Sequence, residues 1–421
     1  MRRIANEYPS TGEQAPWASA DGSAPCGCGT DPLDPAAVDA DVAAAVGRVL
    51  GQELRERVFA AAAIDPVFAQ DIAERVARFT LDGGKRTRSQ FLWWGLRAAG
   101  GGRRAEQTHA ALRIAGAVEL LQTCALVHDD VMDGSALRRG LPAVHCALDA
   151  QYASPPSPGA AEPFGRAAAI LAGDLALAWA DDMVANTILP ANAYRRVRGV
   201  WQAMRTEMVA GQYLDLHGQA TGSRSAARAL RTACLKSALY SVERPLALGA
   251  ALAEADPATT QALCAAGRQT GIAFQLRDDL HGVFGDPAHT GKPSGEDIRD
   301  GKPTYLFAVA RDRVEAAGDQ RAARFLDASL GRADLSASDL DRVRDLLVAT
   351  GAREAVEARI AQLADDSGQY LAGAPRIGPA ARGRLLALFQ QAAGTHPPAP
   401  QPAAGGPAAP GLQDAPLGGD R

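Results

Sequence analysis

The chain has 421 residues and a formal charge of −4, so it is long enough to bury a large core. Its basic residues are spread along the sequence, which argues against a nucleic-acid surface and favours small-molecule partners. Apolar residues make up 47% of the chain and aromatic residues only 5%, which predicts a core of aliphatic side chains.

Residues 1–34 are rich in Gly, Pro, Ser and Ala and predict a disordered leader. Cys26 and Cys28 lie in this leader, but their CGCG spacing alone is a weak metal signal. The start has no apolar segment behind its two arginines, and no uninterrupted apolar run reaches the length of about 18 residues that a membrane span requires. We therefore expect a cytoplasmic protein without a membrane span.

Residues 35–393 carry apolar side chains at helical spacing, with Ala and Leu dominant and β-branched alternation scarce. This pattern predicts one all-α domain of helices separated by short Gly/Pro breaks. Near its start lies the loop GGKRTR, which contains Lys85 and Arg88. Its two glycines permit close backbone approach to a phosphate, but the GxxxxGK[ST] pattern of nucleotide-binding loops is absent from the chain.

Lysine is rare in this chain, because four lysines stand against 40 arginines. A compact ammonium group binds phosphate as a point charge, which a planar guanidinium does not replace geometrically. All four lysines lie in or beside acidic or arginine-containing motifs, which codon bias alone does not explain. They are Lys85, Lys236, Lys292 and Lys302.

Two segments, 110–131 and 167–184, are apolar on nearly every face and predict central helices. The first ends in LVHDDVMD, in which Asp129, Asp130 and Asp133 form a DDxxD pattern. Asp129 and Asp133 share a helix face, and carboxylates gathered on a buried helix repel one another unless divalent cations hold them. Such oxygen ligands suit Mg²⁺.

An acidic helix end exposed to water is the alternative interpretation of this pattern. Arg138 and Arg139 follow the acids closely, and GGKRTR precedes them, so cations surround the carboxylates on both sides. This context favours a metal site that binds phosphates. In the second central helix, Asp174 predicts a hydrogen-bonded structural role, whereas Asp181 and Asp182 predict a solvated helix end.

A second acidic motif, FQLRDDLHGVFGD, begins at Phe274 and contains Asp278 and Asp279, and Asp278 follows Asp129 by 149 residues (278 − 129). The motifs occur in a fixed order: GGKRTR, LLQTCALVHDDVMD with RRG, AILAGD, GQYLD, LKS and FQLRDD. In this order and spacing, the chain resembles the isoprenyl diphosphate synthases, and in particular bacterial geranylgeranyl diphosphate synthases. The resemblance covers roughly residues 41–389 and implies an all-α, isoprenoid synthase-type bundle of long helices around a central active-site cavity.

The resemblance also implies roles for single residues. The metal ligands, which would hold three Mg²⁺ ions, are Asp129, Asp133 and Asp278. The catalytic set adds supporting acids and residues that line the reacting centre: Asp130, Asp279, Gln212, Asp215 and Lys236. Isopentenyl diphosphate would contact Lys85, Arg88, Gln122 and Arg139. The allylic diphosphate would contact Arg138, Lys236, Lys292 and Lys302. Ser237, Phe274 and Gln275 belong to the same substrate-binding set.

The chain departs from many members of the family at Gly282, where they carry a third aspartate in the second motif. We keep Asp278 as the direct metal contact, and we expect Gly282→Asp to tighten Mg²⁺ dependence if the missing acid matters.

The implied reaction is a Mg²⁺-assisted condensation of isopentenyl diphosphate with dimethylallyl, geranyl or farnesyl diphosphate. One turn before Asp129, Cys124 and Ala125 are small and leave the product pocket open, with Leu121 or Trp179 as a deeper floor. We therefore expect a twenty-carbon product, geranylgeranyl diphosphate, with farnesyl or longer polyprenyl diphosphates as alternatives.

Two other functions are less well supported. A class I terpene cyclase would carry Asn, Ser and Glu at fixed spacing in its second motif, and none follows Asp278. A non-catalytic regulatory subunit would lack an acidic motif, and only Gly282 hints at such a loss. The family further implies a homodimer. Residues 394–421, rich in Pro, Ala and Gly, predict a disordered tail.

Overall fold

The computed structural model describes residues 33–152, 164–285 and 294–395. The predicted leader up to residue 32, Lys292, most of the connection between the two central helices, and the tail beyond residue 395 lie outside the described residues. The described residues form helices and one two-stranded hairpin, so the all-α prediction is confirmed. The elements are α1 (Pro35–Ala40), α2 (Val42–Ile64), α3 (Pro66–Phe68), η1 (Ala69–Ala73), α4 (Glu74–Leu81), α5 (Thr87–Ala98), α6 (Ala105–Asp133), β1 (Leu137–Arg138), β2 (Leu141–Pro142), α7 (Val144–Gln151), α8 (Phe164–Ala185), α9 (Ala191–Thr221), α10 (Ala226–Ala233), η2 (Cys234–Glu243), α11 (Arg244–Leu252), α12 (Pro257–Phe284), α14 (Glu296–Arg299), α15 (Tyr305–Ala316), α16 (Gln320–Ser329), α17 (Ala337–Ala349), α18 (Ala352–Ala372) and α19 (Pro379–Ala393).

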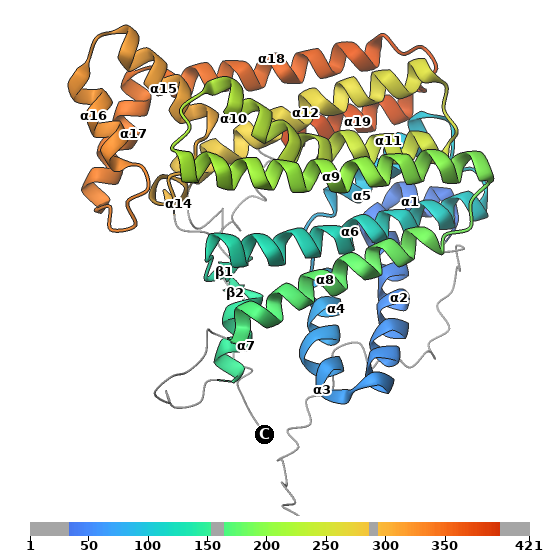
Figure 1. The fold of residues 1–421 in the computed structure, drawn as a ribbon. Helices are drawn as coiled ribbons and strands as arrows, with labels where there is room; N and C mark the ends of the chain where they lie inside the picture. Colours follow the sequence, from blue (N-terminus) through green and yellow to red (C-terminus); the bar gives the residue numbers. More distant parts are fainter. Residues whose placement is uncertain (1–32, 153–163, 286–293, 396–421) are drawn as a thin grey trace, which may run out of the picture.

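Long helices run side by side along the molecule, with α6 packed on α8, and α12 packed on α18 and η2 (Figure 1). Both predicted central helices are present, and each extends a few residues beyond its predicted ends as α6 and α8. Helix α6 is long and apolar enough to cross a membrane, but 78% of its most apolar window is buried inside the bundle. It is therefore a core helix.

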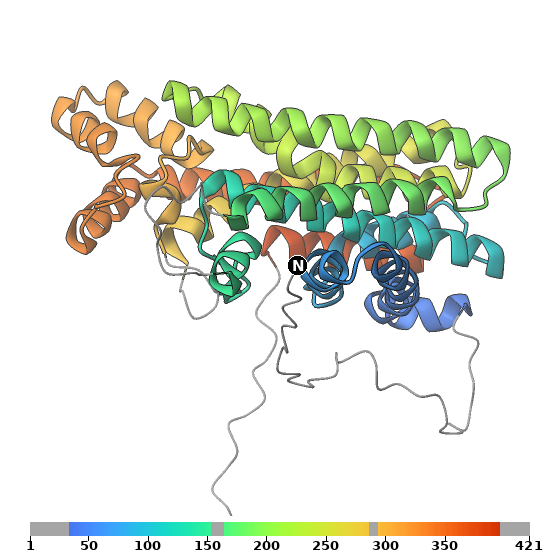
Figure 2. The same cartoon turned by 60° about the horizontal axis from the view of Figure 1, so that its bottom comes forward.

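The apolar core has two clusters. The larger cluster joins α2, α5, α6, α8 and α11, and the smaller one joins the C-terminal half of α12 to α15, α17 and α18. Helices α2 and α4 project from one side of the long-helix layer and are seen nearly end-on in Figure 2. Helix α6, with the first acidic motif at its end, belongs to the larger cluster, whereas the end of α12, with the second motif, belongs to the smaller one.

Helix α6 ends immediately after its acidic motif. Gly134 adopts a left-handed conformation with φ 66°, which glycine tolerates without strain, and its N–H caps the helix by donating to Asp130 O. The last turn of α6 contains no basic residue. Carboxylates at this negative end of the helix dipole are unfavourable, so they need cations from elsewhere in the fold.

A tight hairpin supplies one of those cations. Strands β1 and β2 pair in antiparallel register, with Leu137 opposite Pro142. The two residues between them, Arg139 and Gly140, have φ values of 55° and 76°, which fits the type I′ turn preferred in two-residue hairpins. This hairpin, which the sequence analysis did not predict, directs Arg138 back toward the end of α6.

A π-helix, η2, carries Lys236 and Ser237. It passes between two glycines that permit close helix contact. A Cβ atom at Gly211 of α9 would lie 2.2 Å from Lys236 N, and one at Gly271 of α12 would lie 2.5 Å from Ala238 Cα. π-helical turns are rare and often occur at functional sites. Here the two glycines allow the wider π-helix to fit between α9 and α12.

Candidate active site

Asp129 lies at the centre of a polar cluster at the end of α6. Its Oδ1 accepts a hydrogen bond from Gln212 Nε2 at 3.0 Å and lies 3.3 Å from Lys236 Nζ. Lys236 Nζ also lies 2.6 Å from Asp215 Oδ2. Gln212 and Asp215 come from the GQYLD segment of α9, so three helical segments converge on one carboxylate. The Arg138 guanidinium completes the set, with Nη2 at 3.5 Å from Asp129 Oδ2.

The other two acids of the first motif also contact cations. Asp130 is fully buried and receives a forked pair of hydrogen bonds from Arg138 Nε, at 2.9 and 3.2 Å, and a third from Arg138 Nη2. Asp133 Oδ2 lies 3.2 Å from Lys302 Nζ. Each carboxylate thus has a cationic partner from another segment, as the dipole argument requires.

These charges shift the pKa values of the acids in opposite directions. Burial acts to raise the pKa of Asp129, but Lys236, Arg138 and Lys302 together hold it below its usual value. Burial and the negative charge of Asp129 raise the pKa of Asp133, and Lys302 offsets them only in part. Burial and the nearby Asp129 thus both disfavour the ionised form of Asp133, and a further cation beside it would favour that form.

The second motif differs in its surroundings. Asp278 is exposed near the end of α12, and Asp279 is buried. Gln275 Nε2 donates to Asp279 Oδ1 at 2.8 Å. Burial, with the charges of Asp297, Asp278 and Asp215, raises the pKa of Asp279 well above its usual value. Phe274 lies half-buried one turn before Asp278. Asp215 of α9 thus affects Asp279 of the second motif, and it also shares Lys236 with Asp129 of the first motif.

The loop before α5 forms a second group of cations. Arg86 begins α5 from a left-handed conformation with φ 47°, is buried, and lies 3.8 Å from Glu119 Oε2 of α6. Beside it, Lys85 is exposed, and Arg88 Nη2 donates to Ser241 Oγ of η2 at 2.8 Å. Arg139 of the hairpin reaches the same loop and donates to Asp82 O at 3.3 Å.

Gln122 lies on α6, two turns before Asp129, and its side-chain oxygen is buried without a hydrogen-bond partner in the described residues. A buried, unpaired amide oxygen is costly, which fits a residue placed to meet a ligand. Lys85, Arg88, Gln122 and Arg139 were predicted as one set. The structure places three of them around the loop before α5 and Gln122 on the adjoining helix α6.

The residues predicted to line the product pocket lie on α6, except for Trp179, which lies on α8. Cys124 is 3% exposed and Leu121 is fully buried, whereas Ala125 is half-buried. Burial raises the pKa of the Cys124 thiol to about 12, so the thiol behaves as a small apolar group. Trp179 is buried on α8 beneath Arg57, whose guanidinium carbon lies 5.8 Å from the ring centroid.

The donor set fits Mg²⁺ in its chemistry. Among the described residues, no three His, Cys, Asp or Glu side chains form a ready metal cluster. The Lys236 ammonium group lies between the carboxylates of Asp129 and Asp215. The Lys302 ammonium group lies between those of Asp133 and Asp297. Carboxylate oxygens gathered at one helix end suit a hard divalent cation, which binds one or two carboxylates together with substrate phosphates. Asp129 and Asp133 are the residues of the first motif that would hold it.

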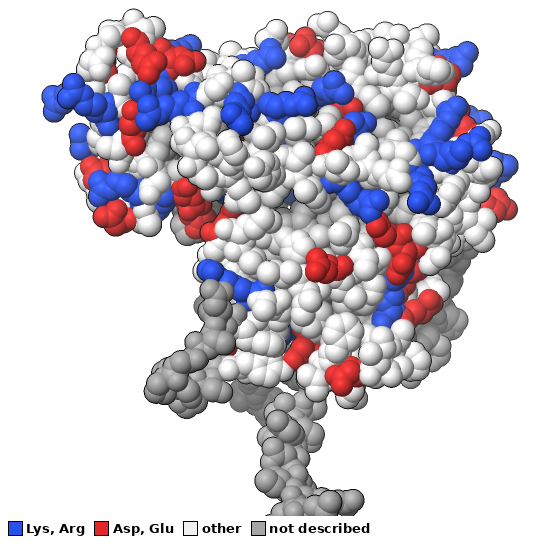
Figure 3. All heavy atoms as spheres, viewed as in Figure 1, with Lys and Arg blue, Asp and Glu red and all other residues white. Residues whose placement is uncertain are grey.

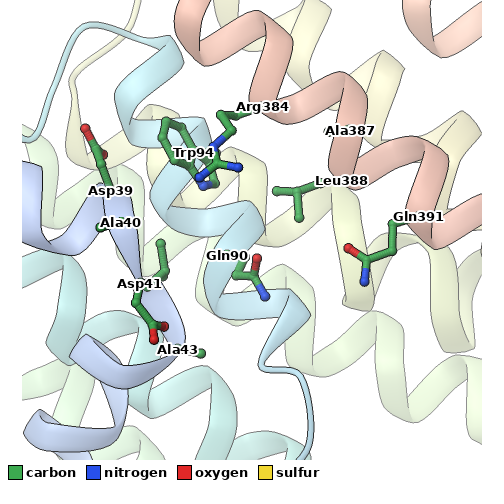
Figure 4. Close-up of a pocket in the computed structure, with 11 residues that line it drawn as sticks. Asp39, Ala40, Asp41, Ala43, Gln90, Trp94, Arg384, Ala387, Leu388 and Gln391 are labelled. Atoms are coloured by element: carbon green, nitrogen blue, oxygen red, sulfur yellow. The ribbon is translucent and has the colours of Figure 1, made fainter. Parts of the chain in front are cut away.

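A cavity of about 250 Å³ lies elsewhere, between α1, α5 and α19 (Figure 4). None of the motif acids lines it. Its Asp39 accepts hydrogen bonds from Arg97 and Trp93, and Arg384 lies over the Trp94 ring at 5.6 Å. The second acid in its lining, Asp41, accepts a hydrogen bond from Ala44 N at the start of α2. Because both acids already have partners, this cavity lacks the chemistry of the site at the end of α6.

Two sequence predictions outside the two acidic motifs were wrong. Asp174 is 62% exposed and only approaches His128, at 3.7 Å, so it is not a hydrogen-bonded interior residue. Asp181 does not merely solvate a helix end, because it accepts hydrogen bonds from Trp201 Nε1 at 2.7 Å and from Arg205. Both predictions used only the position of the residue within one helix, whereas the exposure and pairing of its side chain depend on the neighbouring helices.

Comparison with known proteins identifies the family. The polyprenyl synthetase family model matches residues 70–346. The chain belongs to the polyprenyl synthetase family. It is therefore an isoprenyl diphosphate synthase, a trans-prenyltransferase, as the motifs predicted.

Individual relatives agree with this assignment. The chain is 30% identical to geranylfarnesyl diphosphate synthase of Aeropyrum pernix over 70% of this chain and 85% of that protein. It is 33% identical to geranylgeranyl diphosphate synthase of Mycobacterium tuberculosis over 67% of this chain and 75% of that protein. A geranylgeranyl pyrophosphate synthase structure from Corynebacterium glutamicum, complexed with isoprenyl diphosphate and magnesium, matches with a TM-score of 0.78 and 40% identity, covering 83% and 98% of the chains. The isoprenoid synthase fold is confirmed.

The sequence analysis missed two residues near the site. Arg86 lies in the GGKRTR motif, but its burial against Glu119 becomes visible only in the fold. Asp297 precedes Lys302 in a short acidic segment that reads as a solvated loop, and its approach to α12 depends on tertiary contacts. Rarity of lysine was the available signal, since Lys302 marks this segment.

Proposed function

We propose that this synthase condenses isopentenyl diphosphate with dimethylallyl, geranyl or farnesyl diphosphate and releases geranylgeranyl diphosphate. The observation that carries the proposal is the convergence of Asp129, Asp133, Lys236 and Lys302 from three separate parts of the chain. Carboxylates and ammonium groups placed together bind a diphosphate and its metal ions. The loop before α5 supplies cations for a second diphosphate.

Lys236, Lys302 and Arg138 would bind the allylic diphosphate and neutralise its charge as it leaves. The allylic carbon–oxygen bond breaks, and the bonding electrons stay with the diphosphate. The double bond of isopentenyl diphosphate then forms the new carbon–carbon bond with the allylic cation, and one proton is lost to the released diphosphate. Mg²⁺, proposed as three ions held by Asp129, Asp133 and Asp278, would supply further positive charge to the leaving group.

Burial acts to lower the pKa of Lys236, but the carboxylates of Asp129 and Asp215 raise it, so the ammonium stays charged at the reacting centre. Gln212 would orient the Asp129 carboxylate through its hydrogen bond. Arg138 binds both Asp129 and Asp130 in this structure, so its diphosphate contact requires only a shift of the same side chain. Lys85, Arg88 and Arg139 would hold isopentenyl diphosphate by its own charge.

The twenty-carbon product rests on Ala125, which is small and half-buried one turn before Asp129. A growing chain that leaves the metal end along α6 passes this position without a large side chain to stop it. Similarity to geranylgeranyl synthases supports the same length, whereas similarity to a geranylfarnesyl synthase keeps a longer product as the alternative.

Product analysis tests this proposal. Purified enzyme is incubated with Mg²⁺, isopentenyl diphosphate and each allylic primer, and the dephosphorylated alcohols are separated by chromatography. We expect a twenty-carbon alcohol from every primer that reacts. A fifteen-carbon or a twenty-five-carbon alcohol as the main product would overturn the proposed length, and a cyclised hydrocarbon would overturn the proposed reaction.

We further propose a cytoplasmic homodimer. Large apolar side chains are exposed along α8 and α9, including Ile170, Leu171, Val209 and Tyr213. Figure 3 shows few charged side chains over the middle of this face. A second copy of the chain would cover them. Light scattering of the purified enzyme should give twice the monomer mass, and Leu171→Glu should shift it toward the monomer.

A further inference from the structure

A buried carboxylate on α6 anchors the loop before α5. Glu119 is 8% exposed, and its Oε1 accepts a hydrogen bond from Ser89 Oγ at 2.5 Å. Its Oε2 lies 3.8 Å from Arg86 Nη1. Ser89 and Arg86 are themselves buried, so the whole contact lies inside the fold. Both partners of Glu119 come from the start of α5, directly beside the loop that contains Lys85.

Arg86 differs from the other cations of this group, which are Lys85, Arg88 and Arg139. In the part of the chain that the structure describes, Arg86 is the one member that forms a salt bridge. Its Nη2 also donates to Leu81 O at 2.9 Å. Its left-handed backbone, with φ 47°, is uncommon for a residue other than glycine and persists where surrounding contacts hold it. The charge of Arg86 is thus used within the protein, whereas the other three cations can meet a ligand.

Anchored residues alternate with candidate ligands along this segment. Arg86 and Ser89 contact Glu119, whereas Lys85 is exposed and Arg88 is partly buried. Lys85 directly precedes Arg86, and Arg88 directly precedes Ser89. Since each candidate ligand is bonded to an anchored residue, the contacts of Glu119 restrict where both candidate ligands can lie.

Glu119 also acts on the rest of the predicted isopentenyl diphosphate set. Burial and the charge of Arg138 are the main causes that lower the pKa of Arg139. The Glu119 carboxylate acts in the opposite direction and favours the charged guanidinium. Gln122, with its unpaired side-chain oxygen, follows Glu119 by about one turn of α6. One carboxylate is therefore close to the loop, the hairpin and the α6 member of this set.

We propose that Glu119 is a positioning residue for isopentenyl diphosphate, and that it acts by holding Arg86 and Ser89 inside the fold. With these two residues fixed, Lys85 and Arg88 keep one arrangement around the diphosphate. This inference rests on the proposed function. Loss of the carboxylate would leave Arg86 as a buried, unpaired charge, which favours its movement toward water. The loop would then lose its arrangement, whereas the metal-binding end of α6 would keep its own cations.

The test compares wild type with E119Q, R86Q and the double variant R86Q/E119Q. E119Q removes the charge and keeps the shape of the side chain. E53Q is the matched control, because Glu53 is also a largely buried carboxylate and pairs with Arg113 of α6 instead of with the loop. Steady-state rates are measured with each substrate varied while the other is saturating. Circular dichroism checks the fold, and urea denaturation measures the stability of each variant.

For E119Q and R86Q we expect the KM for isopentenyl diphosphate to rise about tenfold, with kcat and the KM for the allylic substrate unchanged. The double variant should also show a rise of about tenfold, because the two residues act as one unit and their effects do not add. E53Q should lose stability and keep both KM values at wild type. If E119Q fails to fold, R86Q and the double variant carry the same comparison.

A folded E119Q with the wild-type KM for isopentenyl diphosphate would overturn the inference, because any loss of stability would then reflect a structural role alone. Equal increases in both KM values would also overturn it, since the carboxylate would then support the whole site. So would a rise of about a hundredfold in the double variant, because Glu119 and Arg86 would then act independently. A failure of the proposed function is distinguishable, since wild type itself would then not elongate an allylic primer with isopentenyl diphosphate.

Discussion

The two acidic motifs reach similar chemistry by different routes. At the end of α6, Asp129, Asp130 and Asp133 lie on one helix, and each has a cationic partner from elsewhere in the fold. At the end of α12, buried Asp279 is held by the Gln275 amide, and a further carboxylate comes from Asp297 on α14. Figure 1 places α14 at the same end of the molecule as the end of α6.

The two motifs depend on the rest of the fold in different ways. Helical spacing alone gathers the first motif, so removal of one acid leaves no neighbour to replace it. The surroundings of the second motif depend on contact between separate segments, and therefore on the packing of α14 against α12. Substitutions at the two motifs, and at the glycines that bring the segments together, should separate these two kinds of dependence.

The largest effect is expected for Asp129→Ala, which removes the carboxylate shared by Gln212, Lys236 and Arg138. Turnover should fall by about three powers of ten or more, with the fold intact. Steady-state kinetics with saturating substrates measures the loss. Asp174→Ala is the control, because it removes an exposed carboxylate from the neighbouring helix α8 and should leave turnover unchanged. Wild-type turnover in Asp129→Ala would refute the metal assignment.

The next largest effect is expected for a substitution that disturbs the close packing of α9 against η2. In Gly211→Ala, the new methyl group would meet Lys236 N at 2.2 Å, and backbone atoms cannot easily move aside. We expect a loss of about 1–3 kcal/mol in the free energy of unfolding, with lower turnover because Lys236 shifts.

Gly199→Ala on the same helix is the matched control, since no atom lies within 4 Å of the place that its new methyl group would take. It should raise the free energy of unfolding by about 0.5–1 kcal/mol, because position 199 is exposed and alanine is favoured over glycine within a helix. Urea denaturation of both variants measures the difference, and equal stability of the two would show that α9 does not need this close approach.

A smaller effect is expected at the loop before α5. Lys85 is exposed, and its removal takes away a cation from the proposed isopentenyl diphosphate site without touching Asp129. Lys85→Ala should raise KM for isopentenyl diphosphate about tenfold, equivalent to about 1.4 kcal/mol, while KM for the allylic substrate stays unchanged. An increase confined to the allylic KM would show that the two substrate sites are reversed.

The smallest effect on turnover is expected for substitutions in the product pocket. These substitutions should instead change the chain length of the product. Cys124→Phe/Ala125→Phe should shorten the product, because two rings would fill the volume of terminal isoprene units. Cys124 is almost fully buried, so enlarging it costs about 1–3 kcal/mol in folding, and Ala125→Phe alone is the gentler variant. Chromatography of the dephosphorylated alcohols measures chain length. The same length in all three proteins would place the product path elsewhere.

The sequence by itself determined the helical fold, the family and the first acidic motif. Helical periodicity marks α6 and α8, and the i, i+4 spacing of Asp129 and Asp133 places both on one face without any knowledge of neighbours. Lysine rarity marked Lys236 and Lys302 as candidate phosphate-binding cations before their carboxylate partners were known. These features are local, so they can be read from spacing and composition.

Tertiary structure decided which charges meet. The pairing of Lys236 with both Asp129 and Asp215 depends on a π-helix fitted between two glycines, and the pairing of Asp181 with Trp201 depends on α9. The space beside Gly282 is likewise set by another segment, since a Cβ atom there would lie 2.1 Å from Asp297 Oδ2. No local pattern encodes such contacts, because their energies depend on distances between segments that only the packed core fixes.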